Sequence, residues 1–489
     1  MFAAPVAGAT VVVLNSSGTV TLAGPVTTLS DGSYSVNIPT AALTSDLIIS
    51  SVSGTFTDEA TSTDTAAGTL SAYVAGNSLS AGSAVHLDPS STIVRDIVTS
   101  GSGTSIANAE IIFNSVFGYT PDHSIAPMNT AATGTTNASN RLAALRAAAF
   151  SQLANDLGLS PEQQFELIRA IAHDLADDGI INGSAGMVNG SAIPEDIQSK
   201  FEQALVSFMS NTTCNHTGLT TAEIGSLPFG KVVLTNTYRI EYVPGMMAAS
   251  VGKTMFKIKV ANRSTGAPVS GLTLRFMPLM HMATMNHATP MDIATESSTP
   301  GTYNCTAYYL MASGPGMGFW ELKVMTSSGM MGETATFYPS VRMAMGSTTV
   351  RATLKGQADI ISSMTGTEKR SYYLFNDGLA TGSTTTFNLF IAAKSSMMSY
   401  PAVSSGTVLS SPTGTVASMT VEASTDGGIN WVLAVDNANG HWSISGLAGL
   451  VSGTTGTISV KMNVNAEDKT TDGNAVSGAN AYATFIVTP

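Results

Sequence analysis

The spacing of apolar residues changes twice along this chain, and this change restricts the fold more than any other feature. Short runs of alternating apolar and polar residues occupy 1–75 and 231–489, whereas residues 90–211 follow a helical period. In "YRIEYV", Tyr238 and Ile240 alternate with charged residues. Period-two runs indicate half-buried antiparallel strands, and an i, i+3, i+4 spacing indicates amphipathic helices. We therefore predict a multidomain, mainly β protein with an inserted α-helical bundle.

The length of the chain, 489 residues, exceeds what one hydrophobic core normally serves. Many short strands joined by small-residue turns are typical of tandem β-sandwiches. The predicted domains are a β-sandwich over 1–75, a mostly helical domain over 76–230, a methionine-rich β-sandwich over 231–345 and an Ig-like β-sandwich over 346–489.

One helix is predicted together with both of its ends. The run "SPEQQFELIRAIAHDLADDG" starts with Ser160 as N-cap and Pro161 at the first helical position, with Gln163 placed to form a capping box. Gly179 is the expected stop. The predicted core face consists of Phe165, Ile168, Ala172 and Leu175.

Low charge excludes one large class of function. Only 11% of residues are charged and the net charge is −12, so the 21 lysines and arginines form no basic patch for nucleic acid. No run of eighteen apolar residues occurs, and we expect no transmembrane span. The N-terminal "MFAAPVAGATVVVL" lacks the basic and apolar regions of a signal peptide. The protein is therefore either cytosolic or extracytoplasmic (secreted, cell-surface or periplasmic), with an export signal that is not present in this chain. We expect the second alternative, which the acidic and weakly charged composition suits.

No arrangement of residues predicts catalysis. The sequence contains no GxSxG elbow, and "VGKT" has Met247 where a phosphate-binding loop needs its first glycine. The histidines outside the methionine-rich stretch are isolated in sequence from plausible nucleophiles. We therefore predict that the protein is not an enzyme.

The stretch "FMPLMHMATMNHATPM", residues 276–291, carries the densest chemistry of the chain. Thioethers and imidazoles form a soft ligand set, which selects Cu(I) over hard cations. The alternative is that the methionines only fill the core, since methionine adapts to irregular gaps. The candidate copper ligands are Met280, His281, Met282, Met285 and His287, with Met277, Met291, Met311 and Met317 in reserve.

Strand geometry limits how these candidates can combine. Adjacent residues on a strand point to opposite faces, so Met280 and His281 share a metal only if the chain has already left the strand. Met280, Met282 and His287 are expected at a strand end and in a loop, where side chains can converge.

Two family resemblances are carried by short motifs. The stretch "GAPVSGLTLRFMPLMHM…TPGTYNCTAYYLMASGPGMGFWELKV" resembles the YtkA-like and FixH-like β-sandwich family, which implies an extracytoplasmic role in copper handling. The histidine follows the second methionine directly, whereas the family pattern places it two positions on. The matching residues are Gly266, Pro268, Val269, Met277, Pro278, Met280, Gly301, Tyr303, Met311, Gly318, Trp320, Leu322 and Val324.

The N-terminal "PVAGATVVVL…TTLSDGSYSVNIP" resembles the carboxypeptidase-regulatory, transthyretin-like sandwich family. That family usually has one more strand before the "PVAGA" element, and this chain begins four residues before Pro5. An open sheet edge of this kind can accept a strand from a neighbouring subunit. The alternative function is therefore a structural cell-surface or filament subunit, which forms a homopolymer or binds other surface or periplasmic proteins.

Two weaker signals concern calcium and the cysteines. "HDLADDGIINGSA" resembles half of a calcium loop with Asp174 at its first position, but Ala176 and Ala185 replace two carboxylates, so we do not expect calcium. Cys214 and Cys305 can form a disulfide or remain free thiols, and the sequence leaves both alternatives open.

Overall fold

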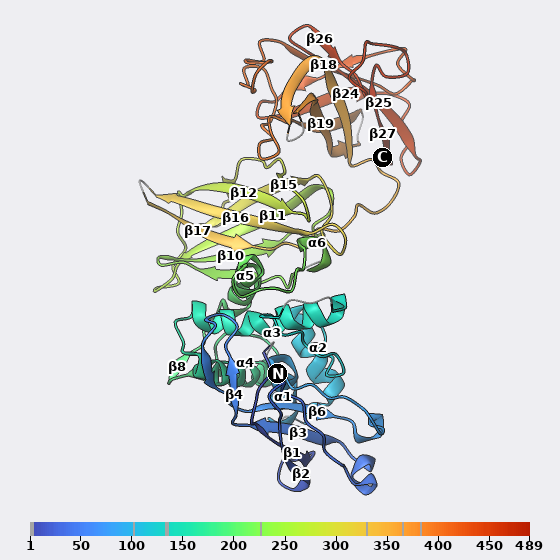
Figure 1. Cartoon of the computed structure of the whole chain (residues 1–489). Coiled ribbons are helices and arrows are strands. Elements are labelled where there is room, and N and C mark those ends of the chain that lie inside the picture. The colour runs from blue at the N-terminus through green and yellow to red at the C-terminus, as the bar shows by residue number, and fades with distance from the viewer. Residues whose placement is uncertain are drawn as a thin grey trace. The chain divides into compact units, whose positions relative to one another are not determined.

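The computed structural model of the chain contains two compact units (Figure 1). The first comprises residues 1–234 with 336–338, and the second comprises 235–335 with 339–489. Both contain antiparallel sheets and the first also contains the helices, so the predicted class is confirmed. The bounds of the four predicted domains stay a prediction. The structure describes residues 4–100, 103–132, 136–224, 227–328, 331–363, 366–381 and 384–489.

A four-stranded antiparallel sheet in the order β2-β1-β3-β6 opens the first unit. Two predicted strand runs form its centre: "GATVVVL" covers β1 except for its last residue, Asn15, and "DLIISSV" contains β3. The third run, "GSYSVNI", is extended but joins no ladder, so its prediction as a paired strand was wrong. The strands of this unit are β1 (Thr10–Asn15), β2 (Thr21–Thr27), β3 (Leu47–Val52), β4 (Thr55–Thr57), β5 (Asp64–Ala66), β6 (Leu70–Val74), β7 (Met187–Val188), β8 (Ser191–Ala192) and β9 (Val232–Leu234).

The helices follow where the period becomes helical. The predicted capping box between Ser160 and Gln163 is present, but it caps the start of a short 3-10 helix over Pro161–Gln163. The helix α4 begins directly after it, at Gln164. Gly179 ends α4 in the left-handed conformation, as predicted. No helix among the described residues is long and apolar enough to span a bilayer. The helices are α1 (Pro89–Thr99), α2 (Ile106–Phe117), α3 (Ala138–Asp156), α4 (Gln164–Asp178), α5 (Ile197–Ser210) and α6 (Thr221–Ile224).

Two sheets form the first sandwich of the second unit. One contains β14, β15, β11 and β10 in that order, and the other has the order β13-β12-β16-β17. The predicted strands "YRIEYV" and "MFKIKV" pair antiparallel as β10 and β11. The bounds are β10 (Tyr238–Pro244), β11 (Gly252–Asn262), β12 (Thr273–His281), β13 (Asn286–Ala288), β14 (Thr295–Glu296), β15 (Thr302–Tyr309), β16 (Phe319–Ser328) and β17 (Met331–Phe337).

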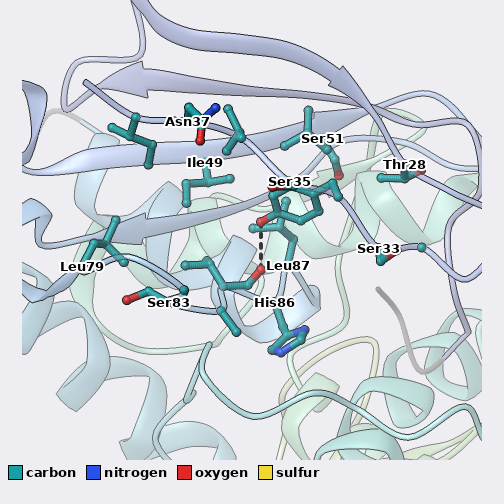
Figure 2. Close-up of a pocket in the computed structure, with 18 of the residues that line it drawn as sticks. Thr28, Ser33, Ser35, Asn37, Ile49, Ser51, Leu79, Ser83, His86 and Leu87 are labelled. Carbon is teal, nitrogen blue, oxygen red and sulfur yellow. Dashed lines mark hydrogen bonds between the residues drawn. The ribbon is translucent and has the colours of Figure 1, made fainter. Parts of the chain in front are cut away.

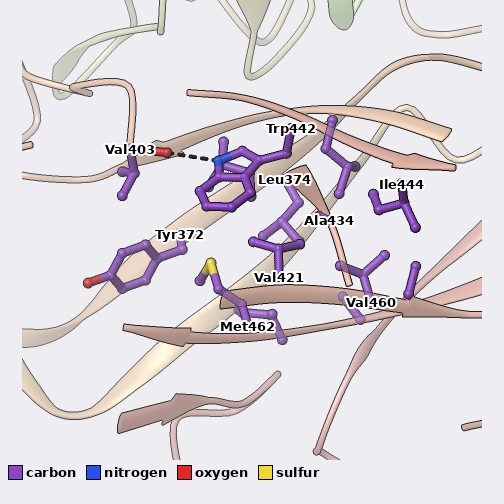
Figure 3. Close-up of a cluster of buried hydrophobic side chains, with 14 of the residues drawn as sticks. Tyr372, Leu374, Val403, Val421, Ala434, Trp442, Ile444, Val460 and Met462 are labelled. Carbon is purple, nitrogen blue, oxygen red and sulfur yellow. Dashed lines mark hydrogen bonds between the residues drawn. The ribbon is translucent and has the colours of Figure 1, made fainter. Parts of the chain in front are cut away.

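The last sandwich also has two sheets, in the orders β18-β19-β20-β24-β23 and β22-β21-β25-β26, and β27 pairs with β25. Its core surrounds the indole of Trp442, which donates a 3.0 Å hydrogen bond to the carbonyl oxygen of Val403 (Figure 3). The bounds are β18 (Arg351–Ser363), β19 (Gly366–Ala380), β20 (Thr385–Ala393), β21 (Met419–Ser424), β22 (Val432–Leu433), β23 (Val435–Asp436), β24 (His441–Leu447), β25 (Gly456–Val464), β26 (Glu467–Lys469) and β27 (Ala483–Val487).

Candidate metal centre

The methionine- and histidine-rich stretch forms a β-hairpin at the edge of its sheet. β12 ends at His281, and β13 returns antiparallel after the turn 282–285. The turn sets the register, and as a result Met280 lies directly opposite His287. On its other side, Met280 lies opposite Trp320 of β16. Cross-strand partners share a face of the sheet, so these three side chains lie on one face.

Met280 and His281 point to opposite faces, as strand geometry predicts. Met280 is fully buried, at 0% exposure. His281 is half-buried on the other face, where its Nε2 lies 2.6 Å from Oε2 of Glu321 and its ring stacks on Phe319 at 5.0 Å. The imidazole of His281 is therefore engaged by a carboxylate, away from Met280.

The inward face joins the hairpin to a residue from the loop after β15. Nε2 of His287 lies 3.1 Å from Sδ of Met311. The indole of Trp320 meets the His287 ring edge to face at 5.4 Å, and its Nε1–H donates to the carbonyl oxygen of Met311 at 3.0 Å. The imidazole of His287 thus contacts both the thioether of Met311 and the indole of Trp320, with Met280 on the same face.

The other hydrogen bond of His287 determines its tautomer. Nδ1 lies 2.8 Å from the carbonyl oxygen of Ala288. A carbonyl oxygen only accepts, so Nδ1 carries the proton and Nε2 of the neutral ring is an acceptor. Nε2 therefore presents its lone pair to the sulfur of Met311. A ring N–H that bonds to a carbonyl is the usual support of a metal-binding histidine, because it fixes both tautomer and orientation.

Burial lowers the pKa of His287, the bond to the Ala288 carbonyl opposes this shift, and the charges of Lys394 and Arg351 lower the pKa further. The ring is therefore neutral near pH 7, and its lone pair is free for a Lewis acid. The charge of Lys394 is compensated by an ion pair with Glu368 at 2.7 Å.

The remaining predicted ligands lie outside this group. Met277 and Met285 are exposed, at 44% and 41%, while Met282 and Met291 are half-buried. Met317 belongs to the tight loop between Gly314 and Gly318. A side chain at Gly318 would collide with the carbonyl oxygen of His281, so only glycine lets this loop approach the hairpin.

Residues from the last sandwich complete the surroundings of His287, and the sequence did not predict them. The amide N–H of Ala288 donates to the carbonyl oxygen of Met397 at 2.8 Å. Arg351 donates to the carbonyl oxygen of Leu310, next to Met311, at 2.9 Å. The dipeptide Met397–Met398 was the one available signal, since it repeats the methionine richness outside the predicted domain. From the sequence, Trp320 is a residue of the motif shared with the YtkA-like family, but its contact with His287 was not predicted.

In the described part of the chain, no three His, Cys, Asp or Glu side chains are placed to hold a metal ion together. These residue types are the usual ligands of zinc and of hard cations. In the calcium-like segment, the carboxylate of Asp174 accepts hydrogen bonds from the backbone N–H groups of Asn182, Gly183 and Ala185 at 2.8–2.9 Å. These bonds give Asp174 a structural role in holding the turn after α4. Both cysteines are free thiols.

A second feature lies in the first unit, where the sheet face around Ile49 and Ser51 borders a cavity of about 640 Å³ (Figure 2). Two segments outside the strands, 33–38 and 79–87, line the cavity, and the second contains a turn at residues 81–82. The hydroxyl of Tyr34 donates to the carbonyl oxygen of Val85 at 2.8 Å and bridges the segments.

Comparisons with known proteins identify no family. No family model matches the chain, and no curated protein matches it. Among solved structures, it is similar to a chimeric titin Z1Z2 carrying a decorin peptide (11% identity, 47% of this chain and 91% of that chain, TM-score 0.13). It is also similar to the N-terminal Ig1-2 module of the Drosophila receptor protein tyrosine phosphatase DLAR (9% identity, 51% and 98%, TM-score 0.14). These likenesses are too weak to carry an argument.

Proposed function

We propose that this protein binds Cu(I) without catalysing a reaction and handles copper outside the cytoplasm. The observation that supports the proposal most is the contact between Nε2 of His287 and Sδ of Met311. Two electron-pair donors face each other at 3.1 Å in a partly buried contact, and the tautomer set by the Ala288 carbonyl leaves no proton between them. Buried acceptors without a donor are unfavourable, whereas a soft cation is attracted by an imidazole and a thioether together.

Each residue of the group has a distinct role in the proposed site. His287 and Met311 are the primary ligands, and Met280 supplies a further thioether from the same face. Trp320 orients Met311 through its carbonyl and places an aromatic ring beside the ion, where a cation is attracted to the π-system. Thioethers do not titrate in the physiological range, so Met311 would remain a ligand in acid while His287 would be lost on protonation.

Core packing alone accounts for only part of the methionine content. It explains Met280, which is fully buried. It does not explain Met277 and Met285, whose exposed side chains contribute little to a core. The resemblance of this sandwich to YtkA-like and FixH-like proteins supports the same proposal.

Anaerobic titration of the full chain with Cu(I) against a competing chelator tests the proposal. Met311→Leu keeps the volume and removes the sulfur, and His287→Gln removes the imidazole. We expect tight binding by the wild type and a loss of roughly 10–100-fold in each variant. Met462→Leu, a buried methionine of the last sandwich, is the matched control and should bind as the wild type does. Equal affinities in all four proteins would overturn the proposal.

A second candidate, a structural subunit assembled by strand complementation, is favoured by the cavity in the first unit. Along 34–38, Tyr34, Val36 and Ile38 face inward and the residues between them are exposed, as on a strand. Among the described residues, no backbone group bonds to the backbone of 34–38. Such a segment can pair with an added strand of about five residues, which would fill the cavity.

Light scattering across a concentration series tests this candidate. If copies assemble through the cavity, the mass of the wild type should rise with concentration. Val36→Lys would place a charge in the cavity and should leave a monomer, while Ser30→Lys, at an exposed residue that does not line the cavity, should assemble normally. A wild type that stays monomeric throughout would exclude self-assembly by this route.

A further inference from the structure

A second group of methionines lies at the surface of the methionine-rich sandwich. Their side chains are 61–107% exposed, so they take no part in the core. Single exposed apolar residues are common, but several on neighbouring segments call for an explanation. The group, called the surface methionines below, consists of Met246, Met247, Met255, Met343 and Met345.

Backbone hydrogen bonds bring the segments that carry these side chains together. The turn between β10 and β11 holds Met246 and Met247, and β11 carries Met255 beside the same turn. The segment 339–346 runs along this turn. The N–H of Arg342 donates to the carbonyl oxygen of Ala249 at 2.8 Å, and the N–H of Val251 donates to that of Arg342 at 2.9 Å. Met343 is the next residue after Arg342.

The two loop segments restrict what these residues can bind. Neither 244–251 nor 339–346 contains Asp, Glu, His or Cys, so thioethers are the only side-chain ligands there. Thioethers bind soft monovalent ions and discriminate against hard cations such as calcium and magnesium.

The segment 339–346 also reaches the interior site. The N–H of Ser313 donates to the carbonyl oxygen of Val341 at 2.8 Å, and the N–H of Val341 donates to Oγ of Ser313 at 2.8 Å. Ser313 is two residues beyond Met311. One short segment therefore contacts the turn with the exposed thioethers on one side and the loop that carries the half-buried Met311 on the other.

We infer that the surface methionines form a second, weaker Cu(I) site, which binds the ion first and passes it to His287 and Met311 by ligand exchange. This inference rests on the proposed function. The transfer replaces one thioether by another ligand at each step, so the ion stays Cu(I) and no oxidant or reductant is required. Because the surface methionines are exposed, the first site takes up Cu(I) quickly and binds it weakly. Because His287 is buried, the second site takes up the ion slowly and binds it tightly.

The test uses the full chain in which all five surface methionines are changed to leucine, with Cu(I) supplied anaerobically. Leucine keeps the apolar surface and removes the sulfur, which separates metal binding from binding of an apolar partner. We expect loss of the weak class of binding sites and roughly tenfold slower loading of the tight site by stopped flow, because the local copper concentration falls. The affinity of the tight site should not change.

Two controls make the result decisive. Met187→Leu removes an exposed methionine of the first unit and should load as fast as the wild type. Met311→Leu should remove the tight class and keep the weak one, so failure of the interior site is distinguished from failure of the surface site. Unchanged stoichiometry and loading rate in the fivefold variant would overturn the inference.

Discussion

The two sandwiches of residues 235–489 bury polar side chains in opposite ways. In the last sandwich, Arg370 is fully buried, and its Nε bonds to both carboxylate oxygens of Asp359 at 2.9–3.0 Å. Its other nitrogens donate to the carbonyl oxygens of Lys394 and Ser410 at 2.9 and 2.7 Å. In the methionine-rich sandwich, the ring of His287 is almost as well buried, but only Nδ1 has a conventional partner.

The proposed binding role of His287 rests on this difference. Most buried polar groups that serve a fold are hydrogen-bonded, because an unpaired one costs about 1–3 kcal/mol. Arg370 meets that condition. Nε2 of His287 has only the sulfur of Met311 as its partner, and in the proposed site a Cu(I) ion would bind to both atoms.

The largest effect should follow from removing the partner of Arg370. Asp359→Ala leaves a buried guanidinium without its counter-charge, and we expect a loss of about 3–5 kcal/mol in the free energy of unfolding. Urea unfolding followed by fluorescence measures it. The double variant Asp359→Leu with Arg370→Met removes both charges and should recover most of the loss. A cost below about 1 kcal/mol for Asp359→Ala would remove the contrast with His287.

Two of the three tryptophans, Trp320 and Trp442, sharpen the comparison. Each indole N–H donates to a backbone carbonyl at 3.0 Å, Trp320 to Met311 and Trp442 to Val403. Trp→Phe at either position should lower the free energy of unfolding by about 2–3 kcal/mol, because the carbonyl oxygen loses its hydrogen-bond donor and a cavity remains. Only Trp320→Phe should also weaken Cu(I) binding in the chelator competition. If both variants bind copper equally, Trp320 has a packing role alone.

The pH dependence of stability tests the contact between the sandwiches. His441 lies 3.1 Å from Asp292 and 3.2 Å from Asp377, and these carboxylates raise its pKa from 6.5 to about 9. Asp377 also contacts Lys253 and Tyr308. The pKa of His441 is higher in the folded protein than in the unfolded chain. The stabilisation that its charge provides is therefore complete below pH 6.5 and is lost as the pH rises through about 9.

We expect His441→Gln to lower stability by about 1–2 kcal/mol at pH 6, with solvent screening of the partly exposed ring allowed for. The difference from the wild type should shrink above pH 9. Thermal unfolding at a series of pH values measures both effects. A constant difference across the series would mean that the charge of His441 is not involved.

The smallest effects on stability should come from exchanging buried methionines. Met462→Leu and Met280→Leu conserve volume and should each cost less than about 1.5 kcal/mol. The copper titration should separate them, because only Met280 shares a face with His287. Equal Cu(I) affinities in the two variants would assign Met280 to packing.

The sequence predicted the fold class because the period of apolar residues records which face of each element is buried. It also predicted that Met280 and His281 diverge. It did not predict that Met280 meets His287, since that register depends on the geometry of the turn 282–285. Met311 reaches the site through a loop that begins after β15, and tertiary contacts of this kind leave no local pattern.

The predicted pairing of "GSYSVNI" failed for a related reason. The alternation of Tyr34, Val36 and Ile38 specifies an extended segment with one inward face. Whether such a segment becomes a strand depends on a neighbouring backbone, which its own residues do not encode.

The bond between Ala288 and Met397 also bears on solubility. β13 is the outermost strand of its sheet, and an outermost strand offers unpaired amides on which other chains can aggregate. The last sandwich occupies one of these amides through the carbonyl of Met397. A truncated protein ending after the methionine-rich sandwich would lose this cover and, in an already weakly charged chain, should precipitate more readily than the full-length protein.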